Sequence, residues 1–167
     1  MKDIFFIFTI AGVMFFNSCK KEPVNSVNID VGTMVFVVDE DGNDLLDPNL
    51  SYEKSINLDE LWLYNVIDGE EVRVFDSLMD NPKGYRLFEP EGKYDSFRLS
   101  VSLMGGHRLT NTRTLLKWTE TEVDTIDAHI EVGDGYEITT KLLLNGEQVW
   151  SVGNEVDSEQ RAITIIK

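Results

Sequence analysis

Oxygen-bearing side chains are concentrated in residues 39–47, which contain Asp39, Asp41, Asn43, Asp44 and Asp47. Carboxylate and amide oxygens are the ligands that Ca²⁺ prefers, so this segment is a candidate calcium site. An EF-hand-type loop, however, has glycine at its sixth position and a bidentate acid at its twelfth. Counting from Asp39, Gly42 is fourth and Leu50 is twelfth. Asp-Gly and Asn-Asp pairs are also typical of tight turns. We therefore favour a solvated turn and keep calcium as the alternative.

The residues that could support catalysis form no recognisable arrangement. His129 alternates with Asp127 and Glu131, so the three side chains should share one strand face. Such a row could bind a transition metal only with ligands from another strand, and we favour a solvated face. His107 follows Gly105-Gly106 and is expected in an exposed loop. No G-x-S-x-G or H-E-x-x-H motif occurs, and thirty acidic residues make any carboxylate pair uninformative. We assign no catalytic residue.

The single cysteine, Cys19, follows an apolar leader. Residues 4–16 are uncharged and apolar, Asn17-Ser18 are small and polar, and a charged stretch follows the cysteine. This order is typical of a secretory signal peptide, and the apolar run is shorter than the roughly 20 residues of a membrane-spanning helix. A cysteine without an intrachain partner in an exported protein requires an explanation other than an internal disulfide.

The leader resembles that of bacterial lipoproteins, in which the cysteine thiol is acylated before cleavage makes it the first residue. The resemblance implies cleavage between Ser18 and Cys19, fatty-acid attachment to Cys19 and anchoring in the outer membrane, with the leaflet left open. Residues 37–48, a strand followed by an acidic Gly turn and Leu-Leu-Asp-Pro, resemble small lipoproteins of the Bacteroidetes whose function is uncharacterised. That resemblance implies an exported all-β domain and supplies no catalytic residues.

The same resemblance implies sites of O-glycosylation, since exported proteins of this group carry sugars at Asp followed by Ser or Thr and an aliphatic residue. Ser77 in Asp76-Ser77-Leu78 and Thr125 in Asp124-Thr125-Ile126 match this short pattern. Ser77 is the better candidate because it follows an expected strand and precedes a polar stretch, whereas Thr125 lies in an expected strand.

The chain is strongly acidic, with a formal net charge of −15 and a pI near 4.4. Nucleic-acid binding needs a basic patch, so this class of partner is not expected. The acids are scattered along the chain, which favours a solvated surface, with a cationic partner as the alternative.

Short apolar runs divided by turn residues predict an all-β domain. Alternating apolar residues in 97–103 and 126–132 indicate strands with one buried face, and Asp68-Gly69, Asp134-Gly135 and Asn145-Gly146 indicate hairpin turns. We expect an antiparallel β-sandwich, immunoglobulin-like in outline, with about 7–9 strands. The tryptophans, Trp62, Trp118 and Trp150, should be core or core-edge residues. The expected layout is a signal peptide (1–18), a lipidated cysteine and tether (19–32) and one domain (33–167).

These observations favour a non-catalytic binding or assembly module at the outer membrane or cell surface, held by its lipid, with a glycan or a surface protein as partner. The alternative is a small exported hydrolase that acts on polysaccharide. Loops cluster at the ends of a sandwich, so the expected ligand surface is the segment 39–55, with its acids and Tyr52. Against this, Leu45, Leu46 and Leu50 could simply pack the segment onto the sheet.

Overall fold

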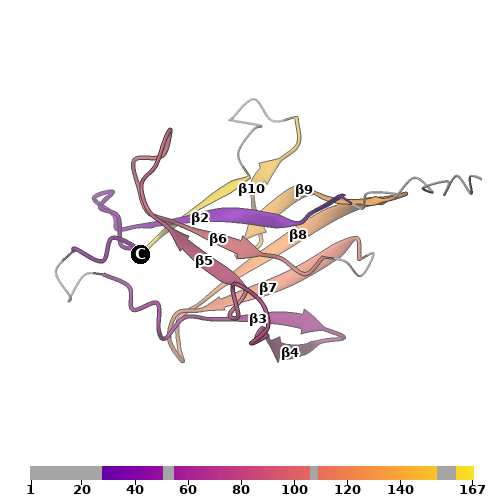
Figure 1. Cartoon of the computed structure of the whole chain (residues 1–167), viewed down its shortest axis with the longest axis horizontal. Coiled ribbons are helices and arrows are strands. Elements are labelled where there is room, and N and C mark those ends of the chain that lie inside the picture. The colour runs from indigo at the N-terminus through magenta and orange to yellow at the C-terminus, as the bar shows by residue number, and fades with distance from the viewer. Residues whose placement is uncertain (1–27, 51–54, 106–108, 154–160) are drawn as a thin grey trace, which may run out of the picture.

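The computed structural model describes residues 28–50, 55–105, 109–153 and 161–167, and these residues form strands and turns without a helix (Figure 1). Within these ranges, therefore, no helix could cross a membrane. The strands are β1 (Asn28–Asp30), β2 (Gly32–Val38), β3 (Trp62–Ile67), β4 (Glu70–Arg73), β5 (Tyr85–Phe88), β6 (Arg98–Ser102), β7 (Asn111–Lys117), β8 (Val123–Gly133), β9 (Tyr136–Leu144), β10 (Glu147–Ser151) and β11 (Ala162–Ile166).

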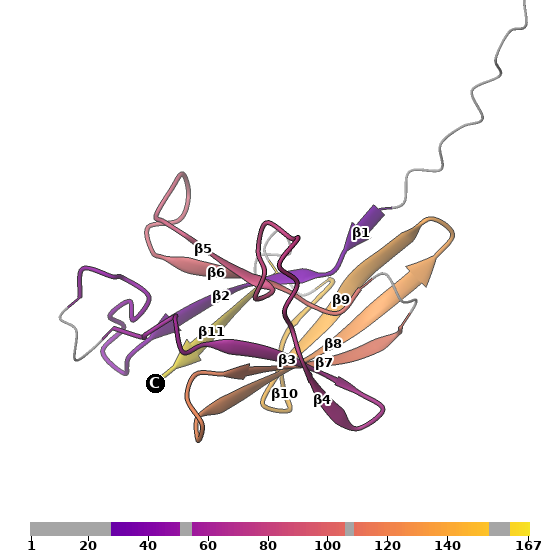
Figure 2. The same cartoon turned by 60° about the horizontal axis from the view of Figure 1, so that its bottom comes forward.

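The strands form two sheets that lie face to face (Figures 1 and 2). The large sheet has the order β1-β9-β8-β7-β3-β4, with β10 also paired to β9, and the small sheet has the order β11-β2-β6-β5. Strands β2 to β8, taken in chain order, correspond to strands B, C, C′, D, E, F and G of an immunoglobulin-type sandwich. In this correspondence, B-E-D lies in the small sheet and C′-C-F-G lies in the large sheet that faces it. The predicted all-β sandwich of immunoglobulin-like outline is confirmed.

The structure adds strands that the sequence patterns did not reveal. It describes eleven strands instead of 7–9. The sheets are mixed and not purely antiparallel as expected, because β1 runs parallel to β9 and β11 runs parallel to β2. Residues 28–32 were expected in the tether. Instead, Asn28–Asp30 form β1 and pair with β9, and Gly32 is the first residue of β2. Strand β1 is exposed throughout, so no buried face gave it a period in the sequence.

The predicted hairpin turns hold the large sheet in register. Asp68 and Gly69 have φ of 53° and 86°, and Asn145 and Gly146 have φ of 51° and 87°. Positive φ at both central residues is the mark of the type I′ turn, whose twist matches that of the flanking strands. Each turn joins strands that pair directly, β3 with β4 and β9 with β10.

Alternation along the strands fills the space between the sheets. In β8, Ile126, Ala128 and Ile130 are buried while the intervening side chains face outward, as predicted. Trp118 and Trp150 belong to the same core, and Trp62 is half-buried on the outer face of the large sheet. The core is built from these buried apolar residues: Val35, Val37, Leu45, Leu46, Leu61, Leu63, Leu99, Val101, Leu103, Leu116, Trp118, Ile126, Ala128, Leu142, Trp150, Ile163 and Ile165.

The described chain begins beside the turn between β8 and β9. The Asn28 amide donates to the Gly135 carbonyl at 2.8 Å, which fixes β1 at the tip of this hairpin. Strand β8 runs through eleven residues, Val123–Gly133, into this hairpin. Strands β1 and β4 are the opposite ends of the six-strand path through the large sheet, so the full width of that sheet separates them.

Candidate functional site

The acidic segment between β2 and β3 uses its carboxylates to cap its own backbone. Asp39 Oδ1 accepts the amides of Asp41 and Asn43 at 3.0 and 2.8 Å. Asp44 accepts the Leu46 amide through Oδ1 at 3.0 Å, and its Oδ2 accepts the amide of Phe97 at 2.7 Å. The Asp44 carboxylate therefore ties this segment to the residue that precedes β6.

A third acid of the candidate calcium set also has local partners, because Asp47 Oδ1 accepts the amide and the side-chain nitrogen of Asn49 at 2.8 and 2.9 Å. In the described part of the chain, no group of three or more His, Cys, Asp or Glu side chains has a metal-binding arrangement. Leu45 and Leu46 are buried in the core. These two leucines pack the segment against the core, as the solvated-turn interpretation expects. Tyr52 lies outside the described residues.

The row around His129 faces outward, as its alternation predicted. Asp127 is paired with Arg113 on the neighbouring strand through two contacts of 2.7 and 3.0 Å. Glu131 accepts the Tyr136 hydroxyl at 2.7 Å. The carboxylates that flank His129 thus have partners of their own, and His107 lies outside the described residues.

Trp62 is engaged by cations of its own chain. The guanidinium carbon of Arg73 lies 3.2 Å from the centroid of the Trp62 ring, and Lys83 Nζ lies 4.3 Å from it. Lys83 Nζ also donates to the Asp59 carbonyl at 2.9 Å. These contacts, which are favourable between a cation and an indole ring, fasten β4 and the segment before β5 to β3. Trp62 therefore lies outside the core, on the opposite face of β3 from the buried Leu63, and the expectation of a core or core-edge position was wrong for this tryptophan.

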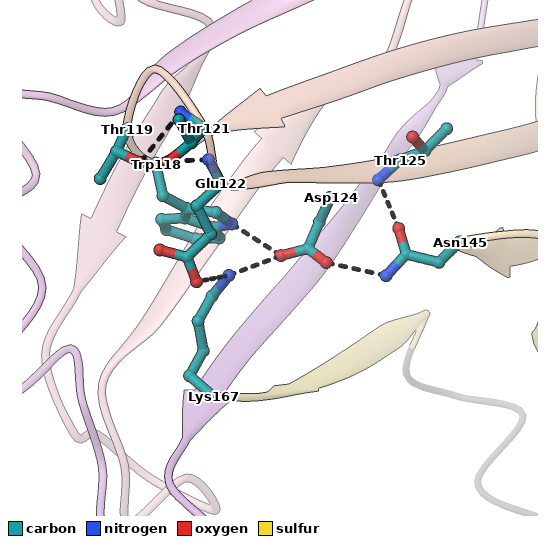
Figure 3. A network of polar contacts seen from close by, with 8 residues as sticks. All are labelled: Trp118, Thr119, Thr121, Glu122, Asp124, Thr125, Asn145 and Lys167. Carbon is teal, nitrogen blue, oxygen red and sulfur yellow. Dashed lines mark hydrogen bonds and ion pairs between the residues drawn. The ribbon is translucent and has the colours of Figure 1, made fainter.

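A polar cluster centres on Asp124 at the start of β8 (Figure 3). Its Oδ2 accepts Trp118 Nε1 at 2.7 Å and Lys167 Nζ at 2.8 Å, and its Oδ1 accepts Asn145 Nδ2 at 2.8 Å. Lys167 also pairs with Glu122 at 2.7 Å. Because Lys167 follows β11 in the small sheet, the cluster joins the two sheets, and we call it the clasp.

Burial raises the pKa of the Asp124 carboxyl, but hydrogen bonds from Asn145, Lys167 and Trp118, together with the Lys167 charge, outweigh burial and lower that pKa below its ordinary value. The charged form is therefore stabilised in the folded state. Both carboxylate oxygens of Asp124 accept hydrogen bonds from donors of the clasp, so the contacts of this cluster are those of a structural link between the sheets.

An exposed apolar edge is the feature that the sequence reasoning missed. Phe75, Leu78 and Met79 are 60%, 92% and 63% exposed, and they follow β4 at the free edge of the large sheet. With Val74 and Pro82 they line an open groove of about 460 Å³. We call these five residues the apolar edge. Large contiguous apolar patches on a soluble surface usually mark an interaction site.

The loop that carries the apolar edge is held in one shape. The Asp76 amide donates to the Pro82 carbonyl at 2.9 Å, and Asp76 Oδ1 accepts the Leu78 amide at 2.9 Å. At Gly84, φ is +79° and an added Cβ would lie 2.7 Å from Cγ1 of Val74. The turn after the groove therefore requires glycine, because the backbone approaches Val74 too closely for a side chain.

The sequence carried one signal of this edge, the adjacent Leu78 and Met79 between Asp76 and Asp80 in a stretch otherwise read as polar. Ser77, the candidate for glycosylation, is exposed in the same loop. Thr125 is only partly exposed, within β8, and its amide donates to Asn145 Oδ1 at 2.8 Å. Of these hydroxyls, that of Ser77 is the more accessible.

Comparisons with protein-family models, curated proteins and solved structures found no match for this chain.

Proposed function

We propose that this chain is an exported lipoprotein, anchored to the outer membrane through fatty acids on Cys19, and that it acts as a non-catalytic binding or assembly module. The leader and Cys19 support export and lipidation. The observation that carries the binding role is the apolar edge, whose three most exposed large side chains are Phe75, Leu78 and Met79.

The position of the apolar edge suits a tethered module. The described chain begins at β1, and the apolar edge follows β4 at the opposite edge of the large sheet. A partner could therefore approach the apolar edge from the side of the sheet that is remote from β1. Anchoring needs stable attachment, which two or more acyl chains provide and one does not.

The chemistry of the apolar edge favours a protein partner. Aromatic side chains and methionine are enriched in protein interfaces, and buried apolar anchors contribute most of the binding energy. Because the loop is held by its own hydrogen bonds, ordering it on binding costs little conformational entropy. Asp76 and Asp80 flank Leu78, and neither forms an ion pair within the described residues, so we propose an apolar socket with a basic rim on the partner.

Site-specific photo-crosslinking in the native host tests the binding role. A photoreactive residue at position 78 should give a discrete adduct, and Met79→Asp should abolish it. The matched control is position 164, which is exposed on β11 in the other sheet. Equal adducts from both positions, or none from position 78, would contradict the proposed surface.

Fatty-acid labelling of cells tests the anchor separately. The wild-type chain should incorporate the label, and Cys19→Ser should not. Label that persists in Cys19→Ser would exclude lipidation at this residue while leaving the crosslinking result intact.

A further inference from the structure

The turn between β9 and β10 contains the only Asn-Gly pair of the chain, Asn145-Gly146. Both residues are exposed, and nothing lies within 4 Å of the position that a Cβ would take on Gly146. An Asn-Gly bond is chemically labile because the glycine nitrogen, with no neighbouring side chain to hinder it, can attack the asparagine carboxamide. In this chain, hydrogen bonds hold the Asn145 carboxamide away from the Gly146 nitrogen.

Both ends of the Asn145 carboxamide are engaged with β8 (Figure 3). Its Nδ2 donates to Asp124 Oδ1 at 2.8 Å, and its Oδ1 accepts the Thr125 amide at 2.8 Å. The main-chain amide of Asn145 donates to the Thr125 carbonyl at the same distance. For ring closure, the Asn145 side chain must leave these contacts and rotate toward the Gly146 nitrogen.

The acceptor that restrains Asn145 is itself fixed by the other sheet. Asp124 is 8% exposed, and the Lys167 side chain that pairs with it is 14% exposed. Trp118 Nε1 completes the set of donors around the carboxylate. The Asn145 carboxamide is thus restrained as long as Lys167 holds Asp124 in place.

We propose that Asn145 is a latent deamidation site that the clasp protects, and that its conversion opens the clasp irreversibly. The Gly146 nitrogen attacks Cγ of Asn145 and forms a new N–C bond. The Cγ–Nδ2 bond breaks, and the amide leaves as ammonia with the proton from the Gly146 nitrogen. Water then opens the succinimide at either carbonyl, which gives aspartate or isoaspartate at position 145.

The product cannot restore the original contacts. A carboxylate has no donor for Asp124 Oδ1, and two carboxylates at hydrogen-bonding distance repel each other. Asp-Gly forms the same type I′ turn as Asn-Gly, so the aspartate form tests the loss of the amide donor without a change of turn type.

The rate of conversion tests the protection. The purified full-length chain is incubated at neutral pH, and the mass gain at Asn145 is followed by peptide mapping in the wild type, Lys167→Met and the urea-unfolded wild type. Conversion of the native wild type should be slowest, and Lys167→Met should raise the rate about tenfold or more, because the reactive form is populated by local opening. Thr164→Ala, an exposed position of β11 shortly before Lys167, should leave the rate unchanged.

Equal rates in native wild type and Lys167→Met, or a native rate as fast as that in urea, would overturn the proposal. Since Lys167→Met could fail to fold, Glu122→Gln supplies a milder variant that removes only the second partner of Lys167. It should accelerate conversion in the same direction, and an unchanged rate in this variant also counts against the proposal.

A second measurement tests the consequence. Asn145→Asp should lower the melting temperature by several degrees. Asn111→Asp, the same change at an exposed residue of β7, should leave the melting temperature within about a degree of wild type. Equal melting of the two variants would show that conversion does not open the clasp.

Discussion

Lys167 Nζ lies 2.8 Å from Asp124 Oδ2, and this ion pair joins the end of the small sheet to the start of β8 in the large sheet. The main-chain amide of Lys167 also donates to the Val38 carbonyl at 2.9 Å, so its backbone is fixed to β2. The two sheets are therefore connected by a charge pair that is largely shielded from water.

Replacing Lys167 by methionine should destabilise the fold strongly. Lys167→Met keeps an apolar stem but leaves the Asp124 carboxylate buried without its cation, a change that typically costs about 3–5 kcal/mol in the free energy of unfolding. Urea denaturation measures it. The control is Lys117→Met, which removes a partly exposed pair with Glu71. This control should cost about 1 kcal/mol or less. Equal costs for the two variants would show that the clasp is no more than a surface pair.

Stability should depend on pH through Asp124. Because its pKa is lower in the folded state than its ordinary value of 3.8, the unfolded chain binds more protons between those two pKa values, and the contribution of Asp124 is lost as the pH falls through this window. Above about pH 5 the contribution is complete. Unfolding free energies of wild type and Asp124→Asn, measured as a function of pH, should differ by a constant amount at neutral pH and converge in acid. A difference that grows in acid would contradict the assigned direction.

The two neighbouring acids of the β2–β3 segment should respond differently to alanine. Asp44→Ala removes the acceptor of the Phe97 amide. Leaving this amide without its partner should cost about 1–3 kcal/mol. Asp41→Ala, by contrast, should change stability by about 0.5 kcal/mol or less, as is usual for a surface substitution. Chemical denaturation of both variants provides the measurement. A negligible effect of Asp44→Ala would show that the amide finds water instead.

Alanine should be poorly tolerated at Gly84, where φ is +79° and an added Cβ would overlap Val74. Backbone strain and overpacking together should cost about 2 kcal/mol in Gly84→Ala. The matched control is Gly69→Ala, because Gly69 has φ of +86° but no atom within 4 Å of the added Cβ. This control should show only the backbone strain, about 1 kcal/mol. Thermal unfolding of both variants separates the steric contribution, and equal losses would mean that the loop shifts to make room.

The sequence was informative where one face of a strand is buried and where a turn needs positive φ. The alternation around Ile126 and the Asn145-Gly146 pair therefore predicted β8 and the β9–β10 turn correctly. The sequence was uninformative about contacts between residues that are far apart along the chain. Nothing local marks Asp124 as the partner of Lys167, which is 43 positions away, or shows that Asp44 caps the amide of Phe97.

The apolar edge was missed for a related reason. A short pair such as Leu78 and Met79 has no period, and only the fold shows whether another element covers it. In this fold β4 is the last strand of its sheet, so the side chains that follow it remain exposed.

The parallel pairing of β11 with β2 sets the order in which the chain can fold. The Thr33 hydroxyl donates to the Arg161 carbonyl across 128 positions of sequence, so this edge closes only when nearly the whole chain is present. Contacts of such long separation slow folding, because the loop between them must be ordered first. Until β11 pairs with it, the apolar strand β2 lacks this partner strand. During that interval the β2 edge has unpaired backbone groups, which are a template for aggregation.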